Sequence, residues 1–155
     1  MVTAARELER DAWEALRKVM DPEIPVVSVV DLGMVERVLV EREGIRVELL
    51  PTFVGCPALD LIRDSVEQRL AAFGRPVAVE FRRHVPWTSD RITEEGRDKL
   101  RRSGFAPPTP ELGDTRCPYC GSANVALENL FGPTQCRSLF YCRGCRQPFE
   151  GFKVV

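Results

Sequence analysis

Hydrophobic residues recur at three- and four-residue intervals in two stretches of the chain, and this spacing predicts helices with one buried face. Capping residues predict a third, short helix. The first predicted helix covers residues 4–20 and ends before Asp21 and Pro22. Its apolar positions are Leu8, Ala12, Leu16, Val19 and Met20. The second begins at Pro57, because a first helical residue needs no N–H, and continues to Phe73. The third follows Thr93, a predicted N-cap, and ends near residue 103.

Three shorter segments alternate between hydrophobic and polar residues, which predicts β-strands. They are MVERVLV at 34–40, IRVELLPT at 45–52 and PVAVEF at 76–81. The turn EREG joins the first two segments into a hairpin. The element order is therefore αββαβα, and we expect an α+β fold with a three-stranded sheet.

The stretch APPTPELGDTR, at residues 106–116, is rich in proline and predicts a linker. We therefore expect a first domain at 1–106, a linker at 107–116 and a second domain at 117–155. The last 39 residues are too few to fold on an apolar core alone, so they need a covalent or metal cross-link. NVALENLF, RSLFY and PFEGFKVV would supply three short strands there.

Two Cys-x-x-Cys motifs, separated by 21 residues, lie in this C-terminal segment. They comprise Cys117, Cys120, Cys142 and Cys145. This spacing is typical of a zinc ribbon, in which four thiolates form a closed, structural Zn²⁺ site. Four cysteines also hold iron or an iron–sulfur cluster, so spacing alone leaves the metal open. A fifth cysteine, Cys136, is either an extra ligand or a small buried residue.

Cys56 stands apart from the other cysteines, directly before the second predicted helix. We expect it to occupy the N-cap, where the helix dipole would lower the pKa of its thiol and make it nucleophilic or metal-binding. The alternative is a small capping residue without chemistry. Asp21 and Glu23 would bring carboxylates to Cys56 if their segment packs there, and His84 would be either its partner or a solvated loop residue. No residue is identified as catalytic with certainty.

The charge is balanced, with 22 basic and 23 acidic side chains and a formal charge of -1. No global field therefore attracts nucleic acid or a membrane surface. The chain also has no apolar run of the roughly 20 residues that a transmembrane helix needs, and its charged beginning does not resemble a signal peptide. We expect a cytoplasmic protein whose thiols stay reduced.

Several motifs occur together in one order: DPEIPVVSVVDLGMV, TFVGCPA, PWTSDRITEEGRDKL, and CPYCGS followed by FGPTQCRSLFYCRGCRQPFEGFK. With these motifs the chain resembles, over nearly its whole length, the PaaD family of phenylacetate-degradation proteins, whose members are also called components of phenylacetyl-CoA epoxidase. Residues from about 10 to 105 resemble the wider iron–sulfur assembly domain, which includes the SUF-pathway T protein. The C-terminal segment resembles the PaaD-type addition.

The resemblance implies an accessory factor that assists iron or iron–sulfur centre assembly in the phenylacetyl-CoA ring-epoxidising oxygenase, and that is not itself the epoxidising enzyme. By resemblance, the family's reactive cysteine is Cys56, a transient metal or cluster ligand, and its acidic segment contains Asp21 and Glu23. The four tail cysteines would hold the metal. The implied partners are oxygenase subunits and iron–sulfur assembly proteins, and a homodimer stays open.

Two other functions remain open at this stage. An iron-loaded tail would make the protein an electron-transfer component of the oxygenase. A zinc ribbon also binds nucleic acid in some proteins, but residues 117–155 carry only 4 basic against 2 acidic side chains. The sequence therefore favours protein partners over nucleic acid.

Overall fold

The computed structural model describes residues 2–53 and 56–153. The chain divides into two compact units, Met1–Trp87 and Thr88–Val155. We call them the N-terminal and the C-terminal unit and describe each by itself. The α+β class expected from the sequence, with a three-stranded sheet followed by a ribbon, is confirmed.

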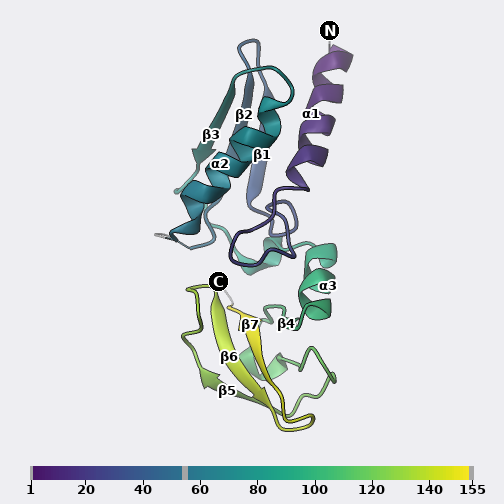
Figure 1. The fold of residues 1–155 in the computed structure, drawn as a ribbon, viewed down its shortest axis with the longest axis vertical. Coiled ribbons are helices and arrows are strands. Elements are labelled where there is room, and N and C mark those ends of the chain that lie inside the picture. The colour runs from purple at the N-terminus through teal and green to yellow at the C-terminus, as the bar shows by residue number, and fades with distance from the viewer. Residues whose placement is uncertain (1, 54–55, 154–155) are drawn as a thin grey trace. The chain divides into compact units, whose positions relative to one another are not determined.

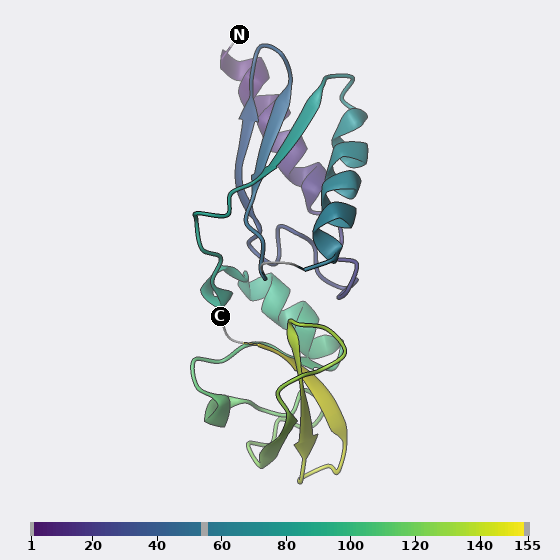
Figure 2. The same cartoon turned by 90° about the vertical axis from the view of Figure 1, so that its left-hand side faces the viewer.

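The N-terminal unit is a three-stranded sheet covered on one face by two helices (Figures 1 and 2). Its elements in chain order are α1 (Val2–Leu16), β1 (Val35–Val40), β2 (Ile45–Leu49), α2 (Ala58–Ala71) and β3 (Val77–Phe81). β1 and β2 form the predicted antiparallel hairpin, and β3 lies parallel to β2. The central position of β2 follows from this order, β1-β2-β3.

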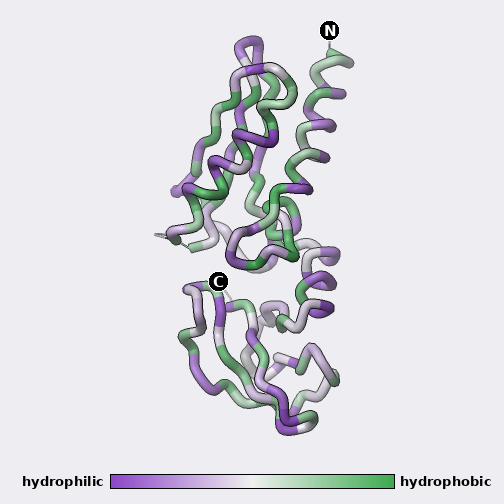
Figure 3. The backbone as a smooth tube through the Cα atoms, viewed as in Figure 1, coloured by the Kyte–Doolittle hydropathy of each residue, from purple (hydrophilic) through white to green (hydrophobic). Residues whose placement is uncertain are grey.

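Alternation along β2 places its apolar side chains in the core. Ile45, Val47 and Leu49 are almost fully buried, as are Leu16 of α1 and Val66 of α2. Figure 3 shows the same alternation of hydrophobic and hydrophilic residues along the strands and helices of this unit. Burial of these side chains, at about 25 cal/mol per Å² of apolar area, is the main favourable term for this unit.

The first helix ends earlier than predicted. The hydrophobic spacing predicts a helix to residue 20, but α1 ends at Leu16. Val19 is instead held by a hydrogen bond from the N–H of Val29 to its carbonyl at 2.9 Å, and Met20 forms a β-bridge with Ser28. These non-local bonds outcompete the helical ones, which a periodic pattern alone does not reveal.

The C-terminal unit contains a four-stranded sheet with the order β4-β7-β6-β5. Its elements are η1 (Ser89–Arg91), α3 (Glu94–Arg102), β4 (Phe105–Ala106), η2 (Leu112–Asp114), β5 (Val125–Asn129), β6 (Arg137–Cys142) and β7 (Pro148–Phe152). The predicted cap of α3 is confirmed, since Thr93 Oγ1 accepts a hydrogen bond from Gly96 N at 3.0 Å. The rings of Phe140 and Phe149 stack with their centroids 5.3 Å apart, in a small core that also contains Cys117 and Cys142.

One strand of this sheet, β4, was not predicted. It has only two residues, and it pairs in parallel with β7 through Phe105 and Ala106. Because α3 leads directly into β4, both elements belong to the same compact unit as the ribbon. The units therefore divide after Trp87, whereas the proline-rich composition predicts a linker at residues 107–116. The domain limits drawn from sequence remain a prediction.

Arg82, directly after β3, contacts two side chains, those of Glu48 and His84. Glu48 on β2 is a buried carboxylate, with a side chain only 6% exposed, and Arg82 Nη1 lies 2.8 Å from its Oε1. Arg37 Nε lies 4.0 Å from Oε2. Arg82 Nη2 also lies 2.9 Å from His84 Nε2, and because arginine only donates, this nitrogen of His84 accepts. The ion pair therefore fastens the segment after β3 to the central strand.

We predict that Arg82→Ala lowers the free energy of unfolding by about 3 kcal/mol, because it leaves the Glu48 carboxylate buried without its closest partner. Urea unfolding at pH 7 measures this effect. Arg46→Ala is the matched control: Arg46 pairs with Glu41 at 3.0 Å, but both side chains are about two-fifths exposed, so we expect a loss below about 1 kcal/mol. Equal losses in the two variants would contradict the assignment.

Candidate metal centre and the Cys56 site

The four tail cysteines converge, as their spacing predicts. The Sγ atoms of Cys117, Cys120, Cys142 and Cys145 all lie within 4.8 Å of one another. Those of Cys117 and Cys145 are 3.7 Å apart, and those of Cys120 and Cys142 are 3.6 Å apart. A tetrahedron with metal–sulfur bonds of about 2.3 Å has edges of about 3.8 Å. The donor set and its size therefore fit a tetrahedral metal ion.

The two Cys-x-x-Cys loops share part of their hydrogen-bond pattern. In each, the N–H of the first cysteine donates to the carbonyl five residues later, from Cys117 to Ser122 at 3.0 Å and from Cys142 to Gln147 at 2.9 Å. Each first sulfur also accepts a backbone N–H, at 3.4 Å from Tyr119 and at 3.5 Å from Cys145. These donors stabilise thiolate sulfur in both loops.

Each loop also turns through a left-handed residue directly after its second cysteine. These residues are Gly121, with φ of 76°, and Arg146, with φ of 61°. Glycine adopts this conformation at no steric cost, whereas arginine does not. The second loop is therefore held by its hydrogen bonds and its sulfurs despite an unfavourable residue.

Electrostatics explain why this site needs a cation. The hydrogen bond from the N–H of Cys145 is the main reason that the pKa of Cys142 is lowered, to about 7, whereas burial raises the pKa of Cys145 to about 12. Four neighbouring thiolates repel one another, so they do not ionise together without a positive charge between them. Zn²⁺ in such a set of four thiolates leaves no open coordination position, which makes the site structural.

Cys136 lies outside this cluster. It is buried and lies directly before β6. Its Sγ lies 3.1 Å from Thr134 Oγ1, and its carbonyl accepts the N–H of Lys153 at 2.9 Å. Of the two sequence-based alternatives, its position fits the small buried residue, since the group of converging sulfurs found among the described residues does not include it.

We predict that the purified protein contains about one zinc ion per chain and that Cys142→Ser loses it. The chain would then lose the cross-link that its short C-terminal sheet needs, and the near-ultraviolet circular dichroism of its tyrosines should fall. Elemental analysis measures the metal. Cys136→Ser is the matched control and should retain full zinc content; loss of zinc in that variant would show that Cys136 is a ligand.

The second sulfur site differs from the prediction in two respects. The N-cap of α2 is Pro57, so Cys56 lies one residue before it, and its carbonyl accepts the N–H of Leu59 at 3.3 Å. The pKa of the Cys56 thiol is raised, not lowered: burial raises it most, a hydrogen bond from the backbone of Ala58 lowers it, and the charges of Glu23 and Asp21 raise it further. The expected thiolate is therefore a protonated thiol at neutral pH.

The same observation shows that the acidic segment lies within electrostatic reach of Cys56. Hydrogen bonds fix the backbone of this segment. Asp21 Oδ1 accepts the N–H groups of Glu23 and Ile24 at 2.8 and 2.9 Å, and Asp21 N donates to Val27 O at 2.9 Å. Ile24 and Val27 are buried and anchor the segment in the core. The backbone that carries these two acids is therefore fixed, and their charges act on the thiol.

Asp31, Trp87 and His84 form contacts within the N-terminal unit. Asp31 is buried and exchanges hydrogen bonds with Ser28, since Asp31 Oδ2 accepts Ser28 N and Ser28 Oγ accepts Asp31 N. Trp87 is buried, and its Nε1 donates to Leu32 O at 2.7 Å. His84 is exposed, and its imidazole contacts the guanidinium of Arg82.

We predict that alkylation of Cys56 by iodoacetamide accelerates at a higher pH than for an ordinary cysteine, because burial and the two acids raise its pKa. Asp21→Asn and Glu23→Gln remove negative charge and should shift the pH–rate profile to lower pH. Peptide mass spectrometry of the zinc-loaded protein follows this one thiol.

Asp60→Asn is the control for this measurement. Asp60 also lies in the first turn of α2, but its side chain is 88% exposed and it is not among the charges that act on Cys56. The profile of this variant should not move. A wild-type midpoint below the ordinary cysteine value would contradict the raised pKa.

Comparisons with known proteins match both parts of the chain that carry these sites. Residues 108–153 match the family model for the PaaD zinc beta ribbon domain, and residues 9–81 match that for an iron–sulfur cluster assembly protein. A protein of Escherichia coli that is named as a subunit of 1,2-phenylacetyl-CoA epoxidase is 35% identical over 165 residues, which cover 100% of this chain and 98% of that protein. The chain belongs to the PaaD family. The resemblance expected from the sequence motifs is thereby confirmed.

Other relatives of this PaaD-family chain match its first part. An Fe-S protein maturation auxiliary factor of Porphyromonas gingivalis is 34% identical over 97 residues, covering 61% of this chain and 91% of that protein. The crystal structure of a domain of unknown function from Bacillus anthracis has a TM-score of 0.60 at 23% identity, covering 64% of this chain and 97% of that chain. The latter likeness concerns the fold alone.

No helix in the described part of the chain is long and apolar enough to cross a membrane.

Proposed function

We propose that this protein is an accessory factor that assists the assembly or insertion of iron or iron–sulfur centres in the client subunits of a phenylacetyl-CoA-epoxidising oxygenase. The observation that carries the proposal is the end-to-end similarity to the Escherichia coli epoxidase component. The similarity of the first part to an Fe-S protein maturation auxiliary factor supports the kind of assistance. These two relatives together support the client and the cargo that we propose.

Cys56, Asp21 and Glu23 are the residues that we assign to transient handling of the cargo metal. The carboxylates that raise the pKa of the Cys56 thiol disfavour loss of a proton into a negative field. The same field attracts an iron cation, which displaces the proton and binds the sulfur. One sulfur with carboxylate neighbours holds a metal less completely than four thiolates do, which suits a ligand that must release its cargo.

The cluster of four tail cysteines has a different role in this proposal. A resident Zn²⁺ there supplies structural cross-linking and no open position for a substrate, so Cys117 and its three companions support the ribbon and do not exchange cargo. Function then depends on protein partners, for which we propose the oxygenase subunits and iron–sulfur assembly proteins. A cytoplasmic location, where thiols stay reduced, is part of the proposal.

The test is reconstitution of the client oxygenase in cells that carry Cys56→Ser. We expect the iron content and the activity of the purified oxygenase to fall at least about tenfold, because the transient ligand is lost. Cys136→Ser is the matched control, since it removes a thiol that lies outside both sites. Normal client iron with Cys56→Ser, at equal levels of the accessory protein, would refute the assignment of this residue.

A further inference from the structure

The C-terminal unit has a groove of about 600 Å³ whose walls are mainly aromatic and apolar. The side chains that form these walls include Phe105, Tyr119, Leu139, Tyr141 and Pro148. The volume lies in the range of about 300–1,000 Å³ that is typical of ligand sites. Neither the metal centre nor the Cys56 site uses this groove.

Strand register explains why these residues share one side of the sheet. Leu139 and Tyr141 are two residues apart on β6, and they lie opposite Glu150 and Pro148 of β7. Alternate residues of a strand point to the same face, so all four belong to one face. Phe105 of β4 continues this face, since it pairs with Glu150. The other face carries the side chains of Phe140 and Phe149, which belong to the small core; both residues also line the groove.

Tyr119 forms the wall nearest the metal centre. It lies between two metal-binding cysteines and is 60% exposed. A Cβ atom on Gly104 would come within 2.8 Å of the Tyr119 hydroxyl oxygen, and Gly104 also has φ of 84°. Only glycine satisfies both conditions without strain, so the backbone at Gly104 makes room for the tyrosine ring. A phenol ring is thus held at the groove with one side open to solvent.

The charged residues that line the groove are acidic, and the guanidinium of Arg137 lies beside it, 4.9 Å from the centre of the Phe105 ring. Among the described residues that line it, the charged ones are Glu128 and Glu150, and none is a lysine or arginine. Glu150 is already paired with Arg137, whose Nη1 lies 3.0 Å from its Oε2. Glu128 is exposed and lies at an irregularity of β5, where the register shifts between Leu127 and Asn129. Irregularities of this kind redirect a side chain, and this one presents an acid at the groove.

We propose that this groove binds an extended, proline-containing segment of a partner protein that carries a lysine or arginine. Extended proline-rich segments dock into grooves lined by aromatic side chains, because their conformation is already fixed and little entropy is lost. Tyr119 and Tyr141 supply the ring faces, and their hydroxyls supply polar contacts for a backbone that has no internal hydrogen bonds. Glu128 is placed to pair with the cation.

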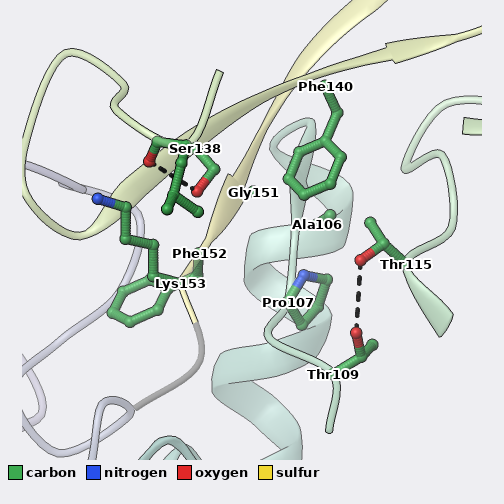
Figure 4. Close-up of a pocket in the computed structure, with 10 residues that line it drawn as sticks. Ala106, Pro107, Thr109, Thr115, Ser138, Phe140, Gly151, Phe152 and Lys153 are labelled. Carbon is green, nitrogen blue, oxygen red and sulfur yellow. Dashed lines mark hydrogen bonds between the residues drawn. The ribbon is translucent and has the colours of Figure 1, made fainter. Parts of the chain in front are cut away.

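A second pocket in the same unit, of about 290 Å³, has a different character. Figure 4 shows the residues that line it. Polar side chains among them already form hydrogen bonds within the protein. Ser138 Oγ donates to Leu130 O at 3.2 Å, and Thr109 Oγ1 donates to Glu111 O at 2.7 Å. The charged residue in its lining is the cation Lys153, so complementarity to a basic peptide distinguishes the larger groove.

The inference goes beyond the proposed function. Recognition of a peptide by the C-terminal unit requires neither Cys56 nor a cargo metal. Failure of one proposal therefore leaves the other intact, since client iron content tests Cys56 and peptide affinity tests the groove.

In the experiment, the zinc-loaded full chain is titrated with the synthetic peptide Pro-Pro-Leu-Pro-Pro-Arg. Calorimetry and changes in ¹⁵N chemical shifts measure the binding. We expect shifts concentrated at Tyr119, Leu139 and Tyr141. Replacing the arginine of the peptide by glutamine should weaken binding about fivefold, as expected for one exposed ion pair, and glutamate should weaken it more. Tyr119→Ala should weaken binding about tenfold or more.

Glu128→Lys and Glu111→Lys form the decisive pair of variants. Both change the charge by the same amount on exposed residues of the same unit, but Glu111 does not line the groove. Glu128→Lys should abolish the preference for arginine, and Glu111→Lys should leave it unchanged. No binding at millimolar peptide, equal affinity for the arginine and glutamate peptides, or binding that is insensitive to Tyr119→Ala would overturn the proposal.

Discussion

The convergence of four sulfur atoms is the constraint on which the C-terminal unit depends. One core cluster of this unit contains a single stacked aromatic pair, Phe140 and Phe149, and the cysteines Cys117 and Cys142 belong to the same cluster. A core of this size does not offset the conformational entropy of its chain. Four thiolates around a divalent cation supply the missing free energy, because folding and metal binding become one process. The repeated hydrogen bonds of the two loops then follow from the need to aim all four sulfurs at one point.

The N-terminal unit has a single cysteine site in place of a cluster of four. Cys56 is the one cysteine in the sequence of the N-terminal unit, and the charges that act on its thiol are those of Glu23 and Asp21. A closed set of thiolates retains its ion, whereas a protonated thiol in a negative field exchanges a proton for a cation and can reverse the exchange. In the function that we propose, the two sites divide permanent and temporary metal binding between separate units. Separate family models match the two parts of the chain.

Features that depend on local spacing were predictable from the sequence, and features that depend on distant partners were not. The two Cys-x-x-Cys motifs define the metal centre because each motif fixes its own loop. The pKa of Cys56 was predicted in the wrong direction, because burial and two acids more than thirty positions earlier outweigh the helix end. The two-residue strand β4 carries no pattern that a sequence window detects. The buried Glu48 had one available signal, a single charge within the apolar run of IRVELL.

Local metal geometry and surface recognition meet at Tyr119. Its N–H donates to Cys117 Sγ at 3.4 Å, so the backbone that carries the tyrosine is part of the metal-binding loop. Its ring rests over Gly104, which joins α3 to β4, so the far side of the groove is built by a segment outside the cysteine motifs. An unfolded loop would leave the ring without a fixed position. A structural metal ion therefore affects more than the stability of the ribbon. The loop that binds it also orients the aromatic wall of the groove.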